Sequence, residues 1–233
     1  MNPQLPLDVS LPARATFEEF VEGDNGQVVQ ALRRLAEGRG DTGQLFLSGP
    51  SASGKSHLLM AAVSQAAERG LAAAYLPFAE LLDLDPGLLE GLAGHALLAF
   101  DDVHLLAGHA AWEAALFRLF NEAREREARL LFSARTGPAT LEIALPDLRS
   151  RLAWGESYTL QPLDDAGREA LLLKRARQRG LQMQPQAAAW MVTHCSRDPR
   201  RLLELLARLD EASLASRRPL TLPFVREQLG ATE

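Results

Sequence analysis

Eight residues in the first quarter of the chain have the composition and spacing of a loop that holds phosphate groups. The stretch 49–56 reads Gly-Pro-Ser-Ala-Ser-Gly-Lys-Ser and fits G-x-x-x-x-G-K-S/T at every fixed position. In such a loop the backbone N–H groups and the start of the next helix form an anion cradle. Lys55, one of only two lysines in the chain, can reach the outer phosphates, and the Ser56 hydroxyl can ligate Mg²⁺. We predict nucleotide binding by Gly49, Pro50, Ser51, Ala52, Ser53, Gly54, Lys55, Ser56 and His57.

Two adjacent carboxylates follow an apolar run further along the chain. Asp101 and Asp102 come directly after Leu-Leu-Ala-Phe, which has the pattern of a strand buried on both faces. The carboxyl ends of such strands form the ligand site of α/β sheets. We assign Asp101, with Ser56, to magnesium and Asp102 to the attacking water. His104 and His109 lie nearby in sequence, but without a third ligand in register they are interpreted as packing or surface residues.

The elements that must position these groups alternate between short apolar runs and helical patterns. Strands are predicted at 45–47, 72–76, 96–100, 130–132 and 158–160, and helices at 27–36, 55–69, 77–89 (interrupted by Pro86-Gly87), 110–127 and 145–152. After Pro162 only helices are predicted, at 164–180, 186–195, 199–216 and 222–229. We therefore expect an extended tail over 1–15, an α/β domain with a five-stranded parallel sheet over 16–162, and a helical domain over 163–233.

The composition excludes several classes of protein. With 47% hydrophobic and 24% charged residues among 233, the chain can bury a core. A single cysteine, Cys195, excludes a disulfide framework and a cysteine-based metal site. No apolar run approaches the roughly 20 residues of a membrane helix, and the N-terminus lacks a secretory pattern. We expect a cytoplasmic protein with no membrane partner.

The charge is unevenly distributed. The net charge is -5, which argues against strong direct DNA binding by bulk electrostatics. Residues 1–162 carry 13 basic and 21 acidic side chains, whereas residues 163–233 carry 12 and 9. The two predicted domains are therefore expected to meet different partners.

Three further segments carry a family resemblance. The stretch 16–25 is similar to a T-F-x-x-F-V-x-G-x-N pattern, 150–155 reads Ser-Arg-Leu-Ala-Trp-Gly, and 197–202 reads Arg-Asp-Pro-Arg-Arg-Leu. With the phosphate loop and the Asp-Asp pair, these segments resemble the AAA+ ATPases, and among them the bacterial replication initiator DnaA and its relatives. The resemblance covers about residues 16–230 and implies an AAA+ core followed by a helical lid.

The layout is similar to the Hda family within that group. The initiator carries an additional N-terminal domain and a C-terminal helix-turn-helix domain, whereas Hda proteins are short regulators that stimulate hydrolysis of ATP bound to DnaA. The resemblance implies DnaA as partner and an N-terminal peptide that binds the sliding clamp (β subunit) of DNA polymerase. Gln4, Leu5, Leu7 and Val9 fit such a peptide loosely, with Val9 where a larger apolar residue is usual.

The resemblance also implies roles for arginines. Arg151 matches the arginine finger that one subunit offers to the nucleotide of the next, with Arg149 as its local rival. Arg200 matches the second sensor, with Arg197 and Arg201 as rivals. A surface salt bridge is the alternative for Arg151.

Other residues are placed by the same resemblance. Ser133 lies on the first-sensor strand, and Phe17, Val21 and Asn25 are expected near the adenine, although Phe17 and Val21 also fit a plain core. Ala134 replaces an aspartate of the initiator, so autonomous ATP hydrolysis is expected to be weak or absent. ADP or ATP with Mg²⁺ is the implied cofactor, and a homo-oligomer is the implied assembly.

Four functions compete at this point. The first is a regulator that binds nucleotide, docks on the clamp and offers Arg151 to DnaA-bound ATP. The second is a helicase-loader ATPase acting in its own oligomer, which would need a basic or aromatic track for single-stranded DNA. The third is a small-molecule phosphotransferase, and the fourth is a nucleotide-stabilised interaction module in which Arg151 has no chemical role.

Overall fold

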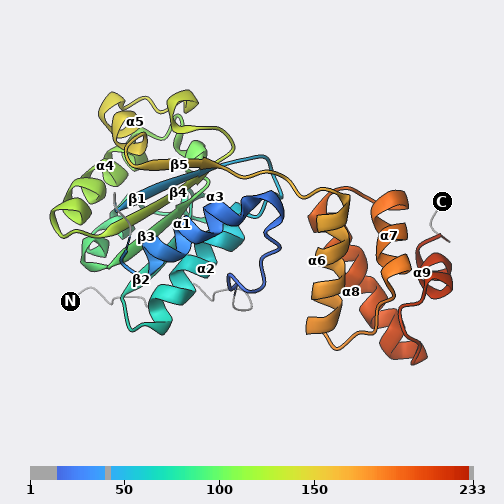
Figure 1. Cartoon of the computed structure of the whole chain (residues 1–233). Coiled ribbons are helices and arrows are strands. Elements are labelled where there is room, and N and C mark those ends of the chain that lie inside the picture. The colour runs from blue at the N-terminus through green and yellow to red at the C-terminus, as the bar shows by residue number, and fades with distance from the viewer. Residues whose placement is uncertain (1–14, 40–42, 231–233) are drawn as a thin grey trace. The chain divides into compact units, whose positions relative to one another are not determined.

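The computed structural model describes residues 15–39 and 43–230, which form two compact units (Figure 1). The first unit holds the described residues up to Phe20 together with Asn25–Gln161. The second holds Val21–Asp24 and the chain from Pro162 onward. The inclusion of Val21–Asp24 in the helical unit has no counterpart in the sequence prediction.

The first unit is built on a parallel sheet whose strand order is β2-β3-β4-β1-β5. In register, Leu47 lies beside Ser133 and Phe100 lies beside Phe132. The carboxyl ends of β1, β3 and β4 therefore lie together at the same end of the strands. The strands are β1 (Gln44–Ser48), β2 (Ala73–Pro77), β3 (Leu97–Asp101), β4 (Arg129–Ala134) and β5 (Glu156–Thr159).

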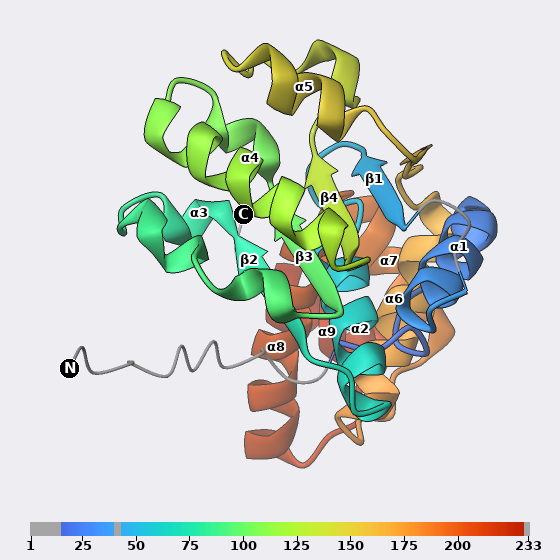
Figure 2. The same ribbon diagram turned by 90° about the vertical axis from the view of Figure 1, so that its left-hand side faces the viewer.

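Each face of this sheet has its own core, because successive strand residues point to opposite sides. On one face, α1 and α2 pack on Leu45, Leu47 and Leu131. On the other face, the rings of Phe46 and Phe132 stack beneath the remaining helices. Figure 2 shows the strands between α4 on one side and α1 and α2 on the other. The helices are α1 (Gly26–Ala36), α2 (Lys55–Glu68), α3 (Phe78–Leu81), α4 (Ala110–Glu125) and α5 (Pro146–Leu152).

The helix predicted over 77–89, with an interruption at Pro86-Gly87, consists of two short pieces. The α-helix α3 ends at Leu81, and a separate 3-10 turn, η2, covers Pro86–Leu89. Asp85 starts this turn, because its carboxylate accepts a hydrogen bond from the backbone N–H of Gly87 at 2.6 Å. Proline at the first position of a helical turn has no N–H to leave unpaired, so Pro86 fits the start of the new turn. The other 3-10 turns are η1 (Gly23–Asn25), η3 (Leu92–Gly94), η4 (Val103–Leu106) and η5 (Pro138–Thr140).

The second unit consists of four helices around a separate apolar core. Side-chain caps set three of the helix starts: Asp164, Asp198 and Thr221 accept hydrogen bonds from backbone N–H groups of the first turn. Leu172, Met191, Leu206 and other buried residues fill its core. The helices are α6 (Asp165–Gln178), α7 (Pro185–His194), α8 (Pro199–Ser216) and α9 (Leu222–Leu229).

The predicted fold class is confirmed: a five-stranded parallel sheet between helices, followed by a helical unit. Within the described part of the chain, none of the helices has the length and apolar composition needed to cross a bilayer.

Candidate nucleotide site

The phosphate loop joins the end of β1 to the start of α2, as the motif requires. Gly49 and Gly54 have φ angles of 153° and 95°, and Ala52 between them is also left-handed, with φ of 60°. A Cβ on Gly49 would lie 3.0 Å from the Ser53 hydroxyl and 3.1 Å from the carbonyl oxygen of Leu160. A side chain at position 49 would therefore come too close to the atoms around the loop, so the loop backbone needs glycine here. Left-handed residues in such a turn point successive N–H groups into one concavity.

The polar groups of the loop fit a phosphate ligand. Lys55 is 6% exposed, and its ammonium group donates hydrogen bonds to the carbonyl oxygens of Gly49 and Pro50, each at 2.9 Å. The Ser53 hydroxyl is buried without a hydrogen-bond partner in the described structure. Because a buried polar group without a partner carries a desolvation cost, Ser53 favours a bound anion at this place.

Asp101 lies at the centre of a hydrogen-bond network at the end of β3. It is 3% exposed, and it accepts hydrogen bonds from the Ser133 hydroxyl and, at 2.6 Å, from the phenol of Tyr75 on β2. The backbone N–H of Asp102 donates to Ser133 at 3.0 Å. The structure thus brings Asp101, Asp102 and Ser133 together, and adds Tyr75, which the sequence analysis missed.

Tyr75 connects this network to the phosphate loop. Burial and the negative charge of Asp101 raise the pKa of Tyr75, whereas the Ser56 side chain lowers the pKa of the same phenol. Ser56 and Asp101 therefore both interact with one hydroxyl group. Their oxygens are hard donors of the kind that Mg²⁺ prefers. No cluster of three or more His, Cys, Asp or Glu suited to a metal occurs among the described residues, so magnesium here would also depend on the phosphates.

Asp102 has a left-handed backbone conformation and lies among other charged side chains. Its φ is 55°, and burial, followed by the charge of Asp101, raises its pKa, while His104, Lys55 and Arg135 oppose the shift. Burial in turn lowers the pKa of His104, whose ring nitrogens have no hydrogen bond within the described chain. Non-glycine residues in this region of φ concentrate at functional sites. Asp102 therefore has the strained, partly desolvated position expected of a water-orienting carboxylate.

The residues expected near the adenine are placed in different surroundings. Phe17 is buried beneath the guanidinium group of Arg33 and not against the phosphate loop. The phenylalanine next to the phosphate loop is Phe20. Its ring stacks on the ring of His57, with centroids 5.8 Å apart, and lies against Gly54. Val21 is partly buried and belongs to the second unit.

Asn25 has a structural role in the first unit. It is 2% exposed, its Nδ2 donates to the carbonyl of Gln161 at 3.0 Å, and its Oδ1 accepts from the Gln161 N–H at 2.8 Å. The side chain thus ties the start of α1 to Gln161, the second residue after β5. Its contact with adenine remains a prediction.

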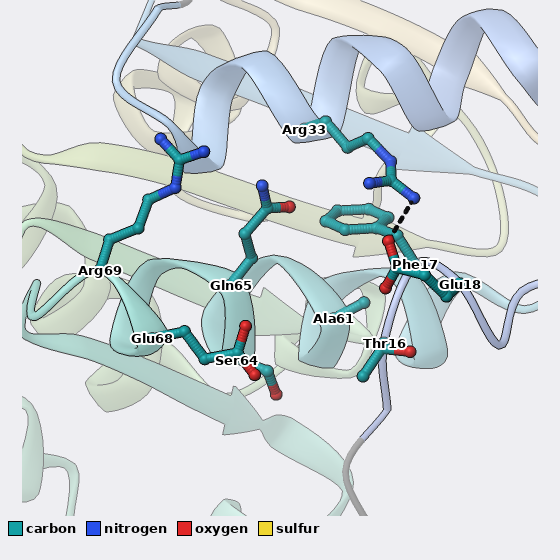
Figure 3. Close-up of a pocket in the computed structure, with 9 residues that line it drawn as sticks. All are labelled: Thr16, Phe17, Glu18, Arg33, Ala61, Ser64, Gln65, Glu68 and Arg69. Carbon is teal, nitrogen blue, oxygen red and sulfur yellow. Dashed lines mark hydrogen bonds and ion pairs between the residues drawn. The ribbon is translucent and has the colours of Figure 1, made fainter.

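Phe17 instead lines a pocket of about 270 Å³ on the outer surface of α1 and α2 (Figure 3). An ion pair of 2.9 Å between Arg33 and Glu18 closes one end of it. Charged groups of both signs line this pocket, which is separate from the phosphate loop.

Arg151 lies in the last turn of α5, on the aromatic ring of Trp154. Its guanidinium carbon is 4.3 Å from the ring centroid. The amide of Gln44, the first residue of β1, donates to the carbonyl oxygens of Arg151 and Trp154 at 3.0 and 2.7 Å. Arg151 is therefore anchored at the amino end of β1, whereas the phosphate loop follows the carboxyl end of that strand.

The second-sensor arginines lie at the start of α8 in the second unit. Arg200 and Arg201 are both exposed, and Arg201 pairs with Glu204 at 2.9 Å. Arg197 lies 4.0 Å from Asp165. Arg200 is the one of the three for which no carboxylate partner occurs in the described chain, and its role as the sensor remains a prediction. The clamp-binding residues Gln4, Leu5, Leu7 and Val9 lie outside the described residues.

Comparisons with known proteins show which folds this structure resembles. Residues 165–229 match the family model described as the Hda lid domain. Domain III of the replication initiator DnaA from Thermotoga maritima is similar over 94% of this chain and 97% of its own, with a TM-score of 0.82 and 24% identity. The helical unit thus matches the Hda lid model, and the chain as a whole shares the fold of DnaA domain III.

Two further structures share the fold at lower similarity. AMPPCP-bound DnaA from Aquifex aeolicus covers 88% of this chain and 67% of its own, with a TM-score of 0.72 and 20% identity. The Holliday junction branch migration motor RuvB from Thermotoga maritima covers 93% and 73%, with a TM-score of 0.67 and 17% identity. The AAA+ fold is thus common to an initiator and a motor, and the fold alone does not select between them.

Proposed function

We propose that this AAA+ protein is a regulator of replication initiation that stimulates hydrolysis of the ATP bound to DnaA. In this proposal residues 16–162 bind ADP or ATP with Mg²⁺ through the loop 49–56, and residues 163–233 form the lid. Residues 4–9 dock on the sliding clamp, and Arg151 is offered to the nucleotide of the initiator. Arg200 contacts the protein's own nucleotide from the lid.

The placement of Arg151 is the observation that carries this proposal. Gln44 holds the backbone of Arg151 at one end of β1, and the phosphate loop begins at the other end. Five strand residues at about 3.3 Å each separate the two ends. A guanidinium anchored there is suited to a nucleotide held by another molecule. This is how an arginine finger works in trans, by stabilising charge on the γ-phosphate.

The protein's own nucleotide serves mainly as structure in this proposal. Asp101, Asp102 and Ser133 supply a metal-holding and water-orienting set, but Ala134 has no side chain that could polarise a water. We therefore expect slow turnover of the protein's own ATP.

The test is hydrolysis of ATP preloaded on purified DnaA, with sliding clamp loaded on DNA. The wild-type chain and Arg151→Ala are compared, with Arg149→Ala from the same short helix as the matched control. We expect stimulation by wild type and Arg149→Ala, and its loss in Arg151→Ala. Unchanged stimulation by Arg151→Ala would reject the finger. No stimulation by wild type, with rapid hydrolysis of its own ATP, would favour the helicase-loader alternative.

Clamp docking has a separate test. Deletion of residues 1–9 is expected to abolish retention on immobilised clamp while the folded unit keeps its thermal stability. A variant with residues 4–9 in scrambled order serves as control for length and composition. Retention of the truncated chain at wild-type level would refute the docking peptide.

A further inference from the structure

A second arginine shares the aromatic ring that carries Arg151. The guanidinium carbon of Arg124, in the last turn of α4, lies 4.3 Å from the ring centroid of Trp154, the same distance as that of Arg151. The two guanidinium carbons are therefore no further apart than twice that distance. Side chains 27 positions apart in sequence thus converge on one indole ring.

The ring that holds both arginines is itself fixed. Trp154 meets the ring of buried Phe120 edge to face, with centroids 6.4 Å apart. The adjacent Gly155 has φ of 78°, and a Cβ there would lie 2.5 Å from the carbonyl oxygen of Gln44. Trp154 is nonetheless 39% exposed, so the cluster is rigid at its base and open to solvent.

Neither guanidinium is neutralised within the described structure. No carboxylate in residues 15–39 and 43–230 lies within ion-pair distance of Arg124 or Arg151. An arginine stacked on a ring keeps its N–H donors at the edge of the guanidinium plane, where they can meet an external acceptor. Two guanidinium groups held on one ring offer two sets of donors to phosphate oxygens.

We propose that Arg124 and Arg151 together form a two-arginine site for the triphosphate of a nucleotide held by a partner molecule, with Trp154 as the residue that positions both. This inference rests on the proposed function, because it assumes that Arg151 acts in trans. It adds Arg124 as a second phosphate-contacting residue and Trp154 as a positioning residue. A compact polyphosphate suits two guanidinium groups on one ring, whereas a single-stranded nucleic acid is bound along an extended basic or aromatic track.

The first experiment measures binding without the initiator. Inorganic triphosphate is titrated against the full chain carrying Lys55→Ala, which removes the contribution of its own loop, and tryptophan fluorescence is followed. Trp154→Phe identifies the signal of Trp154 against Trp112 and Trp190. We expect Arg124→Ala and Arg151→Ala each to weaken binding about tenfold or more. Arg126→Ala, the same charge change two residues along, should leave it unchanged.

The second experiment is the DnaA-bound ATP hydrolysis described above. Arg124→Ala and Trp154→Ala are expected to lower the maximal stimulated rate at least tenfold, and Arg124→Lys should rescue little, because an ammonium lacks the planar stack. Arg126→Ala should behave as wild type. For Trp154, a lowered maximal rate at an unchanged half-saturating concentration of the regulator is the readout that distinguishes positioning from loss of fold.

The outcomes separate the two proposals. If Arg151→Ala abolishes stimulation while Arg124→Ala equals Arg126→Ala in both assays, the proposed function stands and the two-arginine site is rejected. If wild type gives no stimulation, the proposed function fails, and if Arg151→Ala leaves stimulation intact, the finger role of Arg151 fails. In both cases the triphosphate titration still decides whether the anion site exists. If a single-stranded oligonucleotide binds more tightly than triphosphate and Arg124→Ala abolishes it, the cluster is a nucleic-acid surface and this inference is overturned.

Discussion

The ring of Phe20 closes over Gly54 so tightly that a Cβ on this glycine would lie 2.6 Å from ring carbon Cε2. Gly54 is the residue immediately before α2, and its φ of 95° is left-handed. The glycine is therefore required twice, once for its backbone conformation and once for the space that the ring occupies. The phosphate loop and the segment before α1 are coupled at this point.

Gly54→Ala should consequently be worse than an ordinary left-handed glycine substitution. Gly70 is also left-handed, with φ of 77°, but a Cβ there would meet nothing within 4 Å. Gly70→Ala is expected to cost about 1–2 kcal/mol of unfolding free energy through backbone strain alone. Gly54→Ala should cost more and weaken ATP binding at least tenfold, as measured by urea denaturation and calorimetry. Equal effects of the two substitutions would contradict the close contact.

The two lysines of the chain offer a matched pair for the phosphate loop. Lys55→Ala removes the buried ammonium group that bridges the carbonyls of Gly49 and Pro50, and we expect calorimetry to show no measurable ATP binding. Lys174→Ala, in α6, makes the same chemical change away from the loop and should retain wild-type affinity. Unchanged affinity in Lys55→Ala would reject the nucleotide site.

Tyr75→Phe tests the network around Asp101. The substitution removes the donor to a buried carboxylate, and loss of such a bond is expected to cost about 1–3 kcal/mol of unfolding free energy. Tyr158→Phe is the control, because that phenol donates to Glu156 in a more exposed setting. Urea denaturation should show a clear loss for the first and little for the second, and the Mg²⁺ dependence of ATP binding should change only in the first. Similar stabilities for both variants would argue against the network.

Cys195 gives the stability a pH dependence in the alkaline range. Burial raises the pKa of its thiol above the ordinary 9.0. Above pH 9 the unfolded chain therefore loses this proton before the folded chain does, and folding stability falls as the pH rises toward the higher folded pKa. The stability difference between wild type and Cys195→Ala should be flat near pH 7 to 8 and shift against wild type above pH 9. Parallel curves from pH 7 to 10.5 would refute this.

The sequence predicted the groups that belong to local motifs and missed those that arise from packing. The phosphate loop and Asp101 could be located because each follows an apolar strand within a few residues. Tyr75 could not, since a lone tyrosine in a strand shows no pattern until the register places it beside β3.

The convergence of Arg124 on Trp154 has the same origin. It depends on how α4 packs against α5, and nothing in either helix alone indicates the partner. The placement of Phe20 against the phosphate loop, with Phe17 in the core, is a related case. Both phenylalanines lie in the same short segment, and which of them faces the loop is decided by the turn between them.

The edge position of β5 has a consequence for synthesis on the ribosome. β5 pairs with β1 through contacts that join residues 45–48 to 156–159, and Asn25 bonds to Gln161. The first unit therefore cannot close until more than two thirds of the chain has left the exit tunnel, although its N-terminal helix emerges early. Helices α6 and α7 are neighbours in sequence and pack directly on one another, so their contacts form within a short stretch of nascent chain. Until β5 emerges, the β1 edge of the sheet remains unpaired, and a factor that shields the incomplete sheet during translation would act there.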